Sequence, residues 1–235
     1  MTRIKICGLK RPEDAALAAE LGAWALGVIF APESPRRVSI EEAAEVLAAA
    51  PAGVERVGVF VNAGAAEIEE AVKACGLTAV QLHGEEGREF AQEVRELTGV
   101  AVIKAVRVGG EAPEAGVAAR GGEAHEGAPA AVGSEALEGV VQFDTDFILL
   151  DTYHPERRGG TGRVFDWKLA GVIPEGVRRE RLILSGGLDP ENIVEAVRAV
   201  GPFAVDVSSG VESAPGVKDR ERMRRLFENL RKETT

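Results

Sequence analysis

The sequence predicts a single (β/α)8-barrel domain, and three observations support this fold class. The length of 235 residues is within the usual range for one α/β barrel. Short apolar runs alternate with amphipathic stretches from one end to the other, as in right-handed βαβ units. Eight apolar runs favour a closed barrel over a doubly wound sheet, which usually has fewer strands and often a glycine fingerprint after the first strand. The stretch KICGLKRP at the first strand contains no such fingerprint.

The predicted strands lack internal proline and are rich in Val, Ile and Phe, as buried parallel strands usually are. In chain order they cover residues 3–7, 23–30, 54–61, 78–82, 100–106, 146–151, 181–185 and 203–207. The predicted helices cover residues 12–21, 40–50, 65–75, 86–97, 190–199 and 218–231. Two of them have a typical start, because Ser39 precedes IEEAAEVL and Asp189-Pro190 precedes ENIVEAV.

One segment departs from the alternation. Residues 109–140 hold 8 Gly, 9 Ala and six acidic residues against one base, Arg120. The fifth helix of the barrel is expected in this region, but the composition favours an irregular, acidic Gly/Ala-rich surface insertion. A lid or a partner site is the alternative.

Composition and charge narrow the classes of function. A formal net charge of -10 argues against general binding to nucleic acid or to an anionic membrane surface. No apolar run approaches the ~18 residues that span a bilayer, and the N-terminus lacks a secretory signal, so a cytoplasmic location is expected. Cys7 and Cys75 form neither a disulfide framework nor a zinc pattern. The three histidines are widely separated, so no metal site is expected. Monomer and homodimer both remain open.

Polar or reactive side chains recur where the predicted strands end, which is where barrels of this kind hold their active sites. Cys7 ends the first strand, Gln81 and His83 end the fourth, Asp151 ends the sixth, and Asp206 lies on the eighth. This recurrence at one rim indicates a catalytic or binding site more strongly than any single residue does.

Two loops of small residues follow the last two strands. They are Ser185-Gly186-Gly187 and Ser208-Ser209-Gly210. Either alone could be a tight turn, but two together at neighbouring strand ends favour a phosphate site built from backbone N–H groups.

Cys7 and Asp151 each have a structural and a catalytic interpretation. A lone cysteine is usually a packed thiol, but at a strand exit beside Gly8 a thiol can serve as a base if its surroundings favour the thiolate. Asp151 either caps a loop or acts as an acid. Cys75 lies in a helical pattern and is expected in the core, and His125 and His154 are expected in loops.

Two lysines in strands suggest a competing chemistry. Lys5 shares the strand parity of Cys7, so its side chain is expected inside the barrel. A buried lysine can form a Schiff base, as in an aldolase-type lyase, and Lys104 is a second candidate. For Lys5 an ion pair with a barrel carboxylate such as Asp206 is the favoured interpretation.

The chain resembles the phosphoribosylanthranilate isomerases of tryptophan biosynthesis. The matching stretches lie in the family's order over nearly the whole chain: KICGLKRPEDA (5–15), GVIFAPESPRRVS (27–39), VGVFVN (57–62), VQLHGEE (80–86), LLDTYHPERRGGTGRVFDW (149–167), LILSGGLDPENI (182–193) and PFAVDVSSGVES (202–213).

The resemblance implies roles for individual residues. Cys7 matches the family's general base and Asp151 its general acid, while Arg36, beside Arg37, matches the arginine for the anthranilate carboxylate. Gln81 and His83 match polar residues that line the pocket, and Asp206 matches the acid at the end of the eighth strand. The phosphate loops are matched by Gly186, Gly187, Ser208, Ser209 and Gly210, and a glycine-rich loop beside the site is matched by GGTG (159–162).

The implied reaction is an Amadori rearrangement of a phosphorylated aminosugar, and it requires neither a cofactor nor a metal. Three alternatives remain open: the aldolase-type lyase, a non-catalytic protein that binds a phosphorylated ligand, and an isomerase of the related aminoaldose in histidine biosynthesis. The barrels of that last class typically use two aspartates, so a cysteine at position 7 argues against it.

Overall fold

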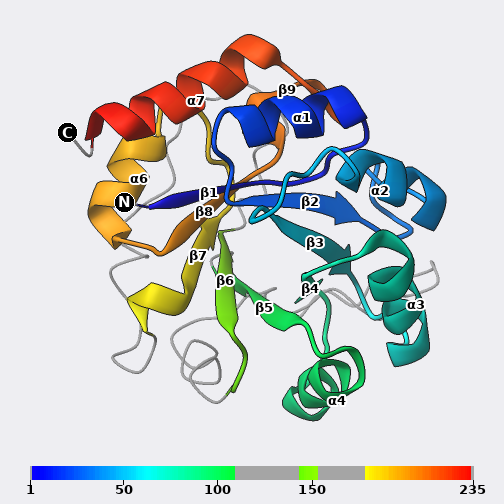
Figure 1. Cartoon of the computed structure of the whole chain (residues 1–235). Coiled ribbons are helices and arrows are strands. Elements are labelled where there is room, and N and C mark those ends of the chain that lie inside the picture. Colours follow the sequence, from blue (N-terminus) through cyan, green and yellow to red (C-terminus); the bar gives the residue numbers. More distant parts are fainter. Residues whose placement is uncertain (1, 109–142, 153–177, 234–235) are drawn as a thin grey trace, which may run out of the picture.

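Eight parallel strands close into a barrel in the computed structural model, which describes residues 2–108, 143–152 and 178–233 (Figure 1). The strands are joined in sequence order, and the last one pairs with the first. They are β1 (Arg3–Ile6), β2 (Ala25–Ile29), β3 (Glu55–Phe60), β4 (Ala79–Leu82), β5 (Ala101–Val108), β6 (Phe147–Thr152), β7 (Leu182–Ser185) and β8 (Ala204–Val207). All eight predicted strands and the predicted fold class are therefore confirmed.

Helices surround the strands on the outside (Figure 1). They are α1 (Pro12–Glu20), α2 (Ile40–Leu47), α3 (Ala65–Cys75), α4 (Arg88–Thr98), α6 (Ile193–Val200) and α7 (Arg220–Glu233). One apolar core lies between helices and strands, and a second lies inside the barrel. The inner core is made of Ala25, Val57, Ala79, Ile103, Ala105, Leu149, Ile183 and Ala204. This division follows from the period of two along each strand, which points alternate side chains inward.

Three aromatic rings pack against this inner core from the N-terminal ends of their strands. Trp24 lies 5.5 Å from Phe147 and 5.2 Å from Phe203 between ring centroids. The guanidinium of Arg3 lies 4.4 Å from the centroid of the Phe203 ring. Because bulky rings fill this end, the polar strand-end residues can gather only at the opposite one.

The helix starts follow local hydrogen bonding. Ser39 caps α2 as predicted, in a capping box with Glu42. The predicted start at Asp189-Pro190 is wrong, because the Asp189 carboxylate accepts the N–H groups of Glu191 and Asn192 in a turn and α6 begins only at Ile193.

Two further helices were predicted to begin two residues before they do in the structure. Lys218 belongs to a hairpin strand, β10 (Val217–Lys218), which pairs with β9 (Glu212–Ala214), so α7 begins at Arg220. Glu86 is buried in an ion pair with Lys104, and α4 begins at Arg88.

The 109–140 segment, the GGTG loop at 159–162, His125 and His154 lie outside the described residues, so the expectations for them stay predictions. Within the described ranges, the helices are all too short or too polar to cross a bilayer.

Candidate active site

Cys7 is placed at the barrel rim by the pairing of the first strand with the last. Its backbone N–H donates to the carbonyl of Val207 over 2.9 Å, and the residue is buried. A Cβ atom on Gly27 of β2 would lie 3.0 Å from the Cys7 sulfur, so a glycine at that position leaves room for the thiol. The next residue, Gly8, has a φ of 70°, which turns the chain sharply away from the strand.

A buried ion pair lies below the thiol. The Lys5 ammonium is 2.8 Å from Asp206 Oδ1, which confirms the favoured interpretation of Lys5. Burial alone lowers the pKa of Lys5, but Asp206 and Cys7 outweigh it and raise that pKa above its ordinary value. A lysine held as a cation is a poor nucleophile, so the structure argues against a Schiff base at Lys5.

The surroundings of Cys7 act on its thiol in opposite directions. Burial raises the pKa of Cys7, the negative charge of Asp206 raises it further, and the positive charges of Lys5 and Lys218 lower it, with a net rise. The resting state is therefore the thiol, so the surroundings of Cys7 do not by themselves meet the condition that they favour the thiolate. The two lysines are nevertheless placed to stabilise a thiolate once it forms.

Asp151 lies at the same rim, on β6. It pairs in register with Ser185 of β7, and the Ser185 hydroxyl is 3.5 Å from Asp206 Oδ2 on β8. A row of polar groups therefore runs along the strand ends from Asp151 through Ser185 to Asp206 and Lys5. The structure thus brings the predicted acid and the predicted base to one end of the barrel.

A second row reaches Asp151 from β4. Gln81 Nε2 is 2.8 Å from His83 Nδ1, and His83 Nε2 is 3.2 Å from Asp151 Oδ2. With the Gln81 amide as donor, the other ring nitrogen of His83 carries the proton and donates to Asp151. This contact holds the carboxyl in a defined orientation. All three residues were predicted for the site, but their direct contact was not.

The two small-residue loops touch each other. Gly186 and Gly187 have φ values of 99° and 63°, a backbone that favours glycine. A Cβ atom on Gly210 would lie 1.9 Å from the carbonyl oxygen of Leu188, so the 208–210 loop packs directly against the end of the 185–187 loop. Ser208 Oγ is buried and has no hydrogen-bond partner among the described residues.

Arg36 extends over the first strand exit. A Cβ atom on Gly8 would lie 2.5 Å from Arg36 Cδ and 2.9 Å from Ser208 Oγ, so Gly8 lies between these two side chains. The guanidinium binds the Glu212 carboxylate through Nε at 2.9 Å and Nη2 at 2.6 Å. Sequence reasoning did not single out Glu212. It follows the 208–210 loop and is 176 residues from Arg36, and no sequence spacing reports a contact over that separation.

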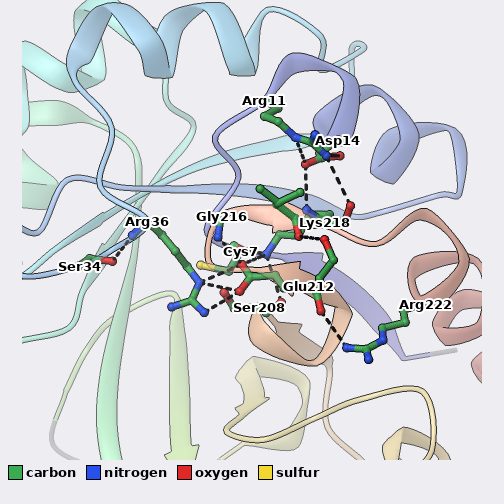
Figure 2. A network of polar contacts seen from close by, with 12 residues as sticks. Cys7, Arg11, Asp14, Ser34, Arg36, Ser208, Glu212, Gly216, Lys218 and Arg222 are labelled. Atoms are coloured by element: carbon green, nitrogen blue, oxygen red, sulfur yellow. Dashed lines mark hydrogen bonds and ion pairs between the residues drawn. The ribbon is translucent and has the colours of Figure 1, made fainter.

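Lys218 completes a charged network that sequence reasoning also missed (Figure 2). Its buried ammonium donates to Glu212 Oε1 over 2.8 Å, to the Cys7 carbonyl over 2.6 Å and to the Ser208 carbonyl over 3.1 Å. Lys218 therefore ties the end of β1, which carries the thiol, to the loop after β8. The sequence pattern placed Lys218 in a helix predicted over 218–231, and an exposed lysine on a helix gives no indication of a functional role.

Lys104, the other candidate for a Schiff base, is also engaged. Its ammonium lies 2.9 Å from Glu86 Oε2 and 2.8 Å from the Gly84 carbonyl, and both charged side chains are buried. Glu86 in turn accepts the backbone N–H groups of Asn62 and Gly84. Lys104 thus supports the loops after β3 and β4, and the structure favours this role over that of a nucleophile.

Comparisons with known proteins agree on one family. The family profile described as "PRAI: N-(5'phosphoribosyl)anthranilate (PRA) isomerase" matches residues 4–125 and 131–229. The N-(5'-phosphoribosyl)anthranilate isomerase of Citrifermentans bemidjiense is 41% identical over 232 residues, which are 99% of this chain and 98% of the relative. That of Halorhodospira halophila is 43% identical over 227 residues, which are 96% of this chain and 95% of the relative.

Solved structures show the same likeness. Phosphoribosyl anthranilate isomerase from Thermotoga maritima has a TM-score of 0.81 and 40% identity, covering 99% of this chain and 100% of its own. A phosphoribosyl anthranilate isomerase in complex with reduced 1-(o-carboxyphenylamino)-1-deoxyribulose 5-phosphate has a TM-score of 0.78 and 38% identity, with the same coverage. The chain belongs to the N-(5'-phosphoribosyl)anthranilate isomerase family.

Proposed function

We propose that the chain converts N-(5'-phosphoribosyl)anthranilate to 1-(o-carboxyphenylamino)-1-deoxyribulose 5-phosphate, with Cys7 as general base and Asp151 as general acid. The observation that carries this proposal is the meeting of a buried thiol and an oriented carboxyl at one barrel rim, beside two touching loops of small residues. Family membership supplies the substrate class and the place in tryptophan biosynthesis.

The reaction needs one proton donor and one acceptor. Asp151 protonates the ribose ring oxygen, and the ring opens as the anthranilate nitrogen supplies its lone pair. The resulting iminium acidifies the C2 proton, which Cys7 removes as thiolate, and tautomerisation of the enolamine gives the ketose. Because the substrate provides its own electron sink, this route needs no added electrophile. Lys5 and Lys218 oppose the effect of burial on the Cys7 pKa, and His83 orients Asp151.

The substrate is proposed to lie across the barrel mouth. Its phosphate would take backbone N–H groups from Gly186, Gly187, Ser208, Ser209 and Gly210. The loops contain neither Lys nor Arg, so their backbone N–H groups would make the direct contacts to the phosphate.

The other groups of the substrate would meet side chains at the rim. The carboxylate of the anthranilate ring would bind Arg36, and Gln81, His83 and Asp206 would line the pocket between the two ends. A related solved structure carries the reduced product in its complex, which supports a phosphorylated aminosugar as the ligand class.

A fluorescence assay tests this function. Purified protein mixed with N-(5'-phosphoribosyl)anthranilate should abolish the anthranilate-type emission of the substrate at a rate proportional to the protein concentration. Absence of turnover, with the protein folded by circular dichroism, would reject the proposal. Light scattering of the same sample distinguishes the two proposed assembly states, monomer and homodimer.

A further inference from the structure

The contact between Arg36 and Glu212 poses an electrostatic problem for the proposed function. Glu212 occupies one edge of the guanidinium, with Nε 2.9 Å from Oε1 and Nη2 2.6 Å from Oε2. An arginine carries five N–H donors in a planar fork, so the end of the fork at Nη1 stays open to a second carboxylate. Among the described residues, Nη1 has no hydrogen-bond partner. Geometry therefore permits a ligand carboxylate, but an isolated Arg36–Glu212 pair has no net charge with which to attract it.

Lys218 changes this balance. Its ammonium is 2.8 Å from Glu212 Oε1, and the Lys218 side chain has no exposed surface of its own. Two cations then share one anion, and the three groups together carry a net charge of +1. Burial weakens solvent screening, so the charge of Lys218 offsets that of Glu212 more fully than a surface lysine could.

The other charges around these three groups do not reverse the sign of this sum, because Arg222, which donates to the Glu212 backbone carbonyl over 2.8 Å, is a further cation. Asp14 accepts the backbone N–H of Lys218 over 3.1 Å, but the Arg11 guanidinium binds that carboxylate at 2.7 and 2.8 Å. Glu212 stays ionised, because Arg36 and Lys218 outweigh burial and hold its pKa below the ordinary value. The ammonium itself cannot turn away, since its three hydrogens meet Glu212, the Cys7 carbonyl and the Ser208 carbonyl.

We propose that Lys218 is a specificity-determining positioning residue, which neutralises Glu212 and so leaves the charge of Arg36 for the substrate's ring carboxylate. Glu212 fixes the orientation of the guanidinium, and Lys218 keeps this fixation from cancelling its charge. The proposal rests on the proposed function, because it takes the ring carboxylate as the group that Arg36 binds. It assigns substrate discrimination to a side chain that the substrate does not touch.

The test compares two inhibitors that differ only in this carboxylate. One is reduced 1-(o-carboxyphenylamino)-1-deoxyribulose 5-phosphate, and the other is the same compound without the ring carboxylate. Dissociation constants are measured by calorimetry for the wild type, Lys218→Met, Glu212→Gln and the double variant. The ratio of the two dissociation constants reports the contribution of the ring carboxylate to affinity, because any damage to the thiol or the phosphate loops affects both compounds.

We expect the wild type to bind the carboxylated compound about 10-fold to 100-fold more tightly, the range of one or two charge-assisted hydrogen bonds. Lys218→Met leaves a neutral Arg36–Glu212 pair, so the ratio should fall to within about threefold of unity. The double variant also removes the carboxylate that neutralises Arg36 and restores a net charge of +1, so the ratio should recover most of its wild-type value. Glu212→Gln should keep the ratio, because the amide oxygen still accepts from the Arg36 guanidinium while the net charge does not fall.

The double variant separates charge from structure. If Lys218 only anchors the Cys7 and Ser208 carbonyls, the double variant must discriminate as poorly as Lys218→Met, and that result would overturn the inference. An unchanged ratio in Lys218→Met would overturn it too, as would equal affinities in the wild type. Should Lys218→Met not fold, Glu212→Gln decides, because loss of its ratio refutes the charge argument. Wild-type protein that binds neither compound would instead reject the proposed function itself.

Discussion

At the scale of single residues, the reactive groups are distinguished by what surrounds them. Cys7 and Cys75 are both buried, and burial raises the pKa of both thiols. Only Cys7 has two ammonium groups acting on it, those of Lys5 and Lys218. Cys75 instead packs in the core as predicted, with its sulfur 3.4 Å from the Ile40 carbonyl. Nearby cations, more than depth, therefore distinguish the thiol proposed as the general base from the thiol of the core.

Replacing Cys7 by serine should lower kcat by about 10²–10⁴-fold, because a hydroxyl is a far weaker base than a thiolate. Since the resting thiol has a raised pKa, kcat/KM of the wild type should increase with pH and level off above the ordinary thiol value of about 8.5. Steady-state kinetics over pH 6–10 checks both points. Serine at Cys75, as the matched control, should leave the pH profile in place, and a near-normal kcat for Cys7→Ser would make Cys7 a packing residue.

Asp151→Asn should cripple kcat while KM changes little, because an amide fills the same space beside His83 but donates no acidic proton. Asp144→Asn makes the same chemical change at an exposed residue that precedes the N-terminal end of β6. It should leave kcat and KM unchanged. Kinetics of the two variants side by side is the measurement. A defect of Asp151→Asn confined to KM would assign the carboxyl to binding.

At the scale of elements, the site depends on close approach between loops that belong to different strands. The 185–187 and 208–210 loops follow β7 and β8, which pair in register through Ile183 and Ala204. Gly210 lets the two loops touch, since any Cβ there would meet the Leu188 carbonyl. The close packing of the two loops thus depends on the absence of a side chain at Gly210.

Gly210→Ala should push the two loops apart, raise KM about tenfold or more and weaken competitive inhibition by inorganic phosphate. Its effect on kcat should be smaller if Cys7 and Asp151 stay in place. Gly64→Ala is the matched control, because the N-cap of α3 has no atom within 4 Å of the added carbon. Normal KM and normal phosphate inhibition in Gly210→Ala would show that the anion binds elsewhere.

The elements also show how far sequence reasoning reached. All eight strands follow from runs of Val, Ile and Phe, since a strand buried on both faces leaves a continuous apolar signal. Helix starts were harder, because Asp189 forms a local turn and Lys218 a short hairpin directly before the helices begin. Most of the candidate site residues were predicted from motifs at the strand ends. Glu212 and Lys218 were not, because their role arises from contacts with Arg36 and Cys7 that no local pattern encodes.

At the scale of the whole molecule, buried ion pairs replace apolar packing at the active end of the barrel. Lys5–Asp206, Lys104–Glu86 and Lys218–Glu212 are all buried. Each contributes little net stability when intact, but removal of one partner leaves a buried charge that costs about 3–5 kcal/mol. The pairs therefore specify the geometry of this end.

These pairs make stability depend on pH in acid. Lys104 and two backbone N–H groups outweigh burial and hold the pKa of Glu86 below its ordinary value. Because the pKa of Glu86 is lower in the folded state than in the unfolded state, the unfolded state binds more protons at pH values between the two. The contribution of Glu86 is thus complete above about pH 4.3 and is lost as the pH falls through the folded-state value.

Glu86→Gln should lower the free energy of unfolding by about 3 kcal/mol or more near neutral pH and should flatten its decline in acid. Urea unfolding between pH 3 and 7 measures both effects. Glu69→Gln removes an exposed pair with Lys73 and should cost within about 0.5 kcal/mol. Equal losses of stability in the two variants would show that burial of the Glu86–Lys104 pair does not increase the cost of removing one partner.

The joint between β8 and β1 has a consequence for when activity arises during synthesis. At this joint Lys5 pairs in register with Asp206, so strands some 200 residues apart in the chain meet there. The strand that carries the thiol leaves the ribosome long before its partner β8, which is translated about 200 residues later. A nascent chain that stops before residue 203 lacks the carboxylate opposite Lys5, the Ser208 loop and Lys218 together. The rim around Cys7 therefore cannot assemble gradually as the chain grows, and it is complete only after Lys218 has been translated.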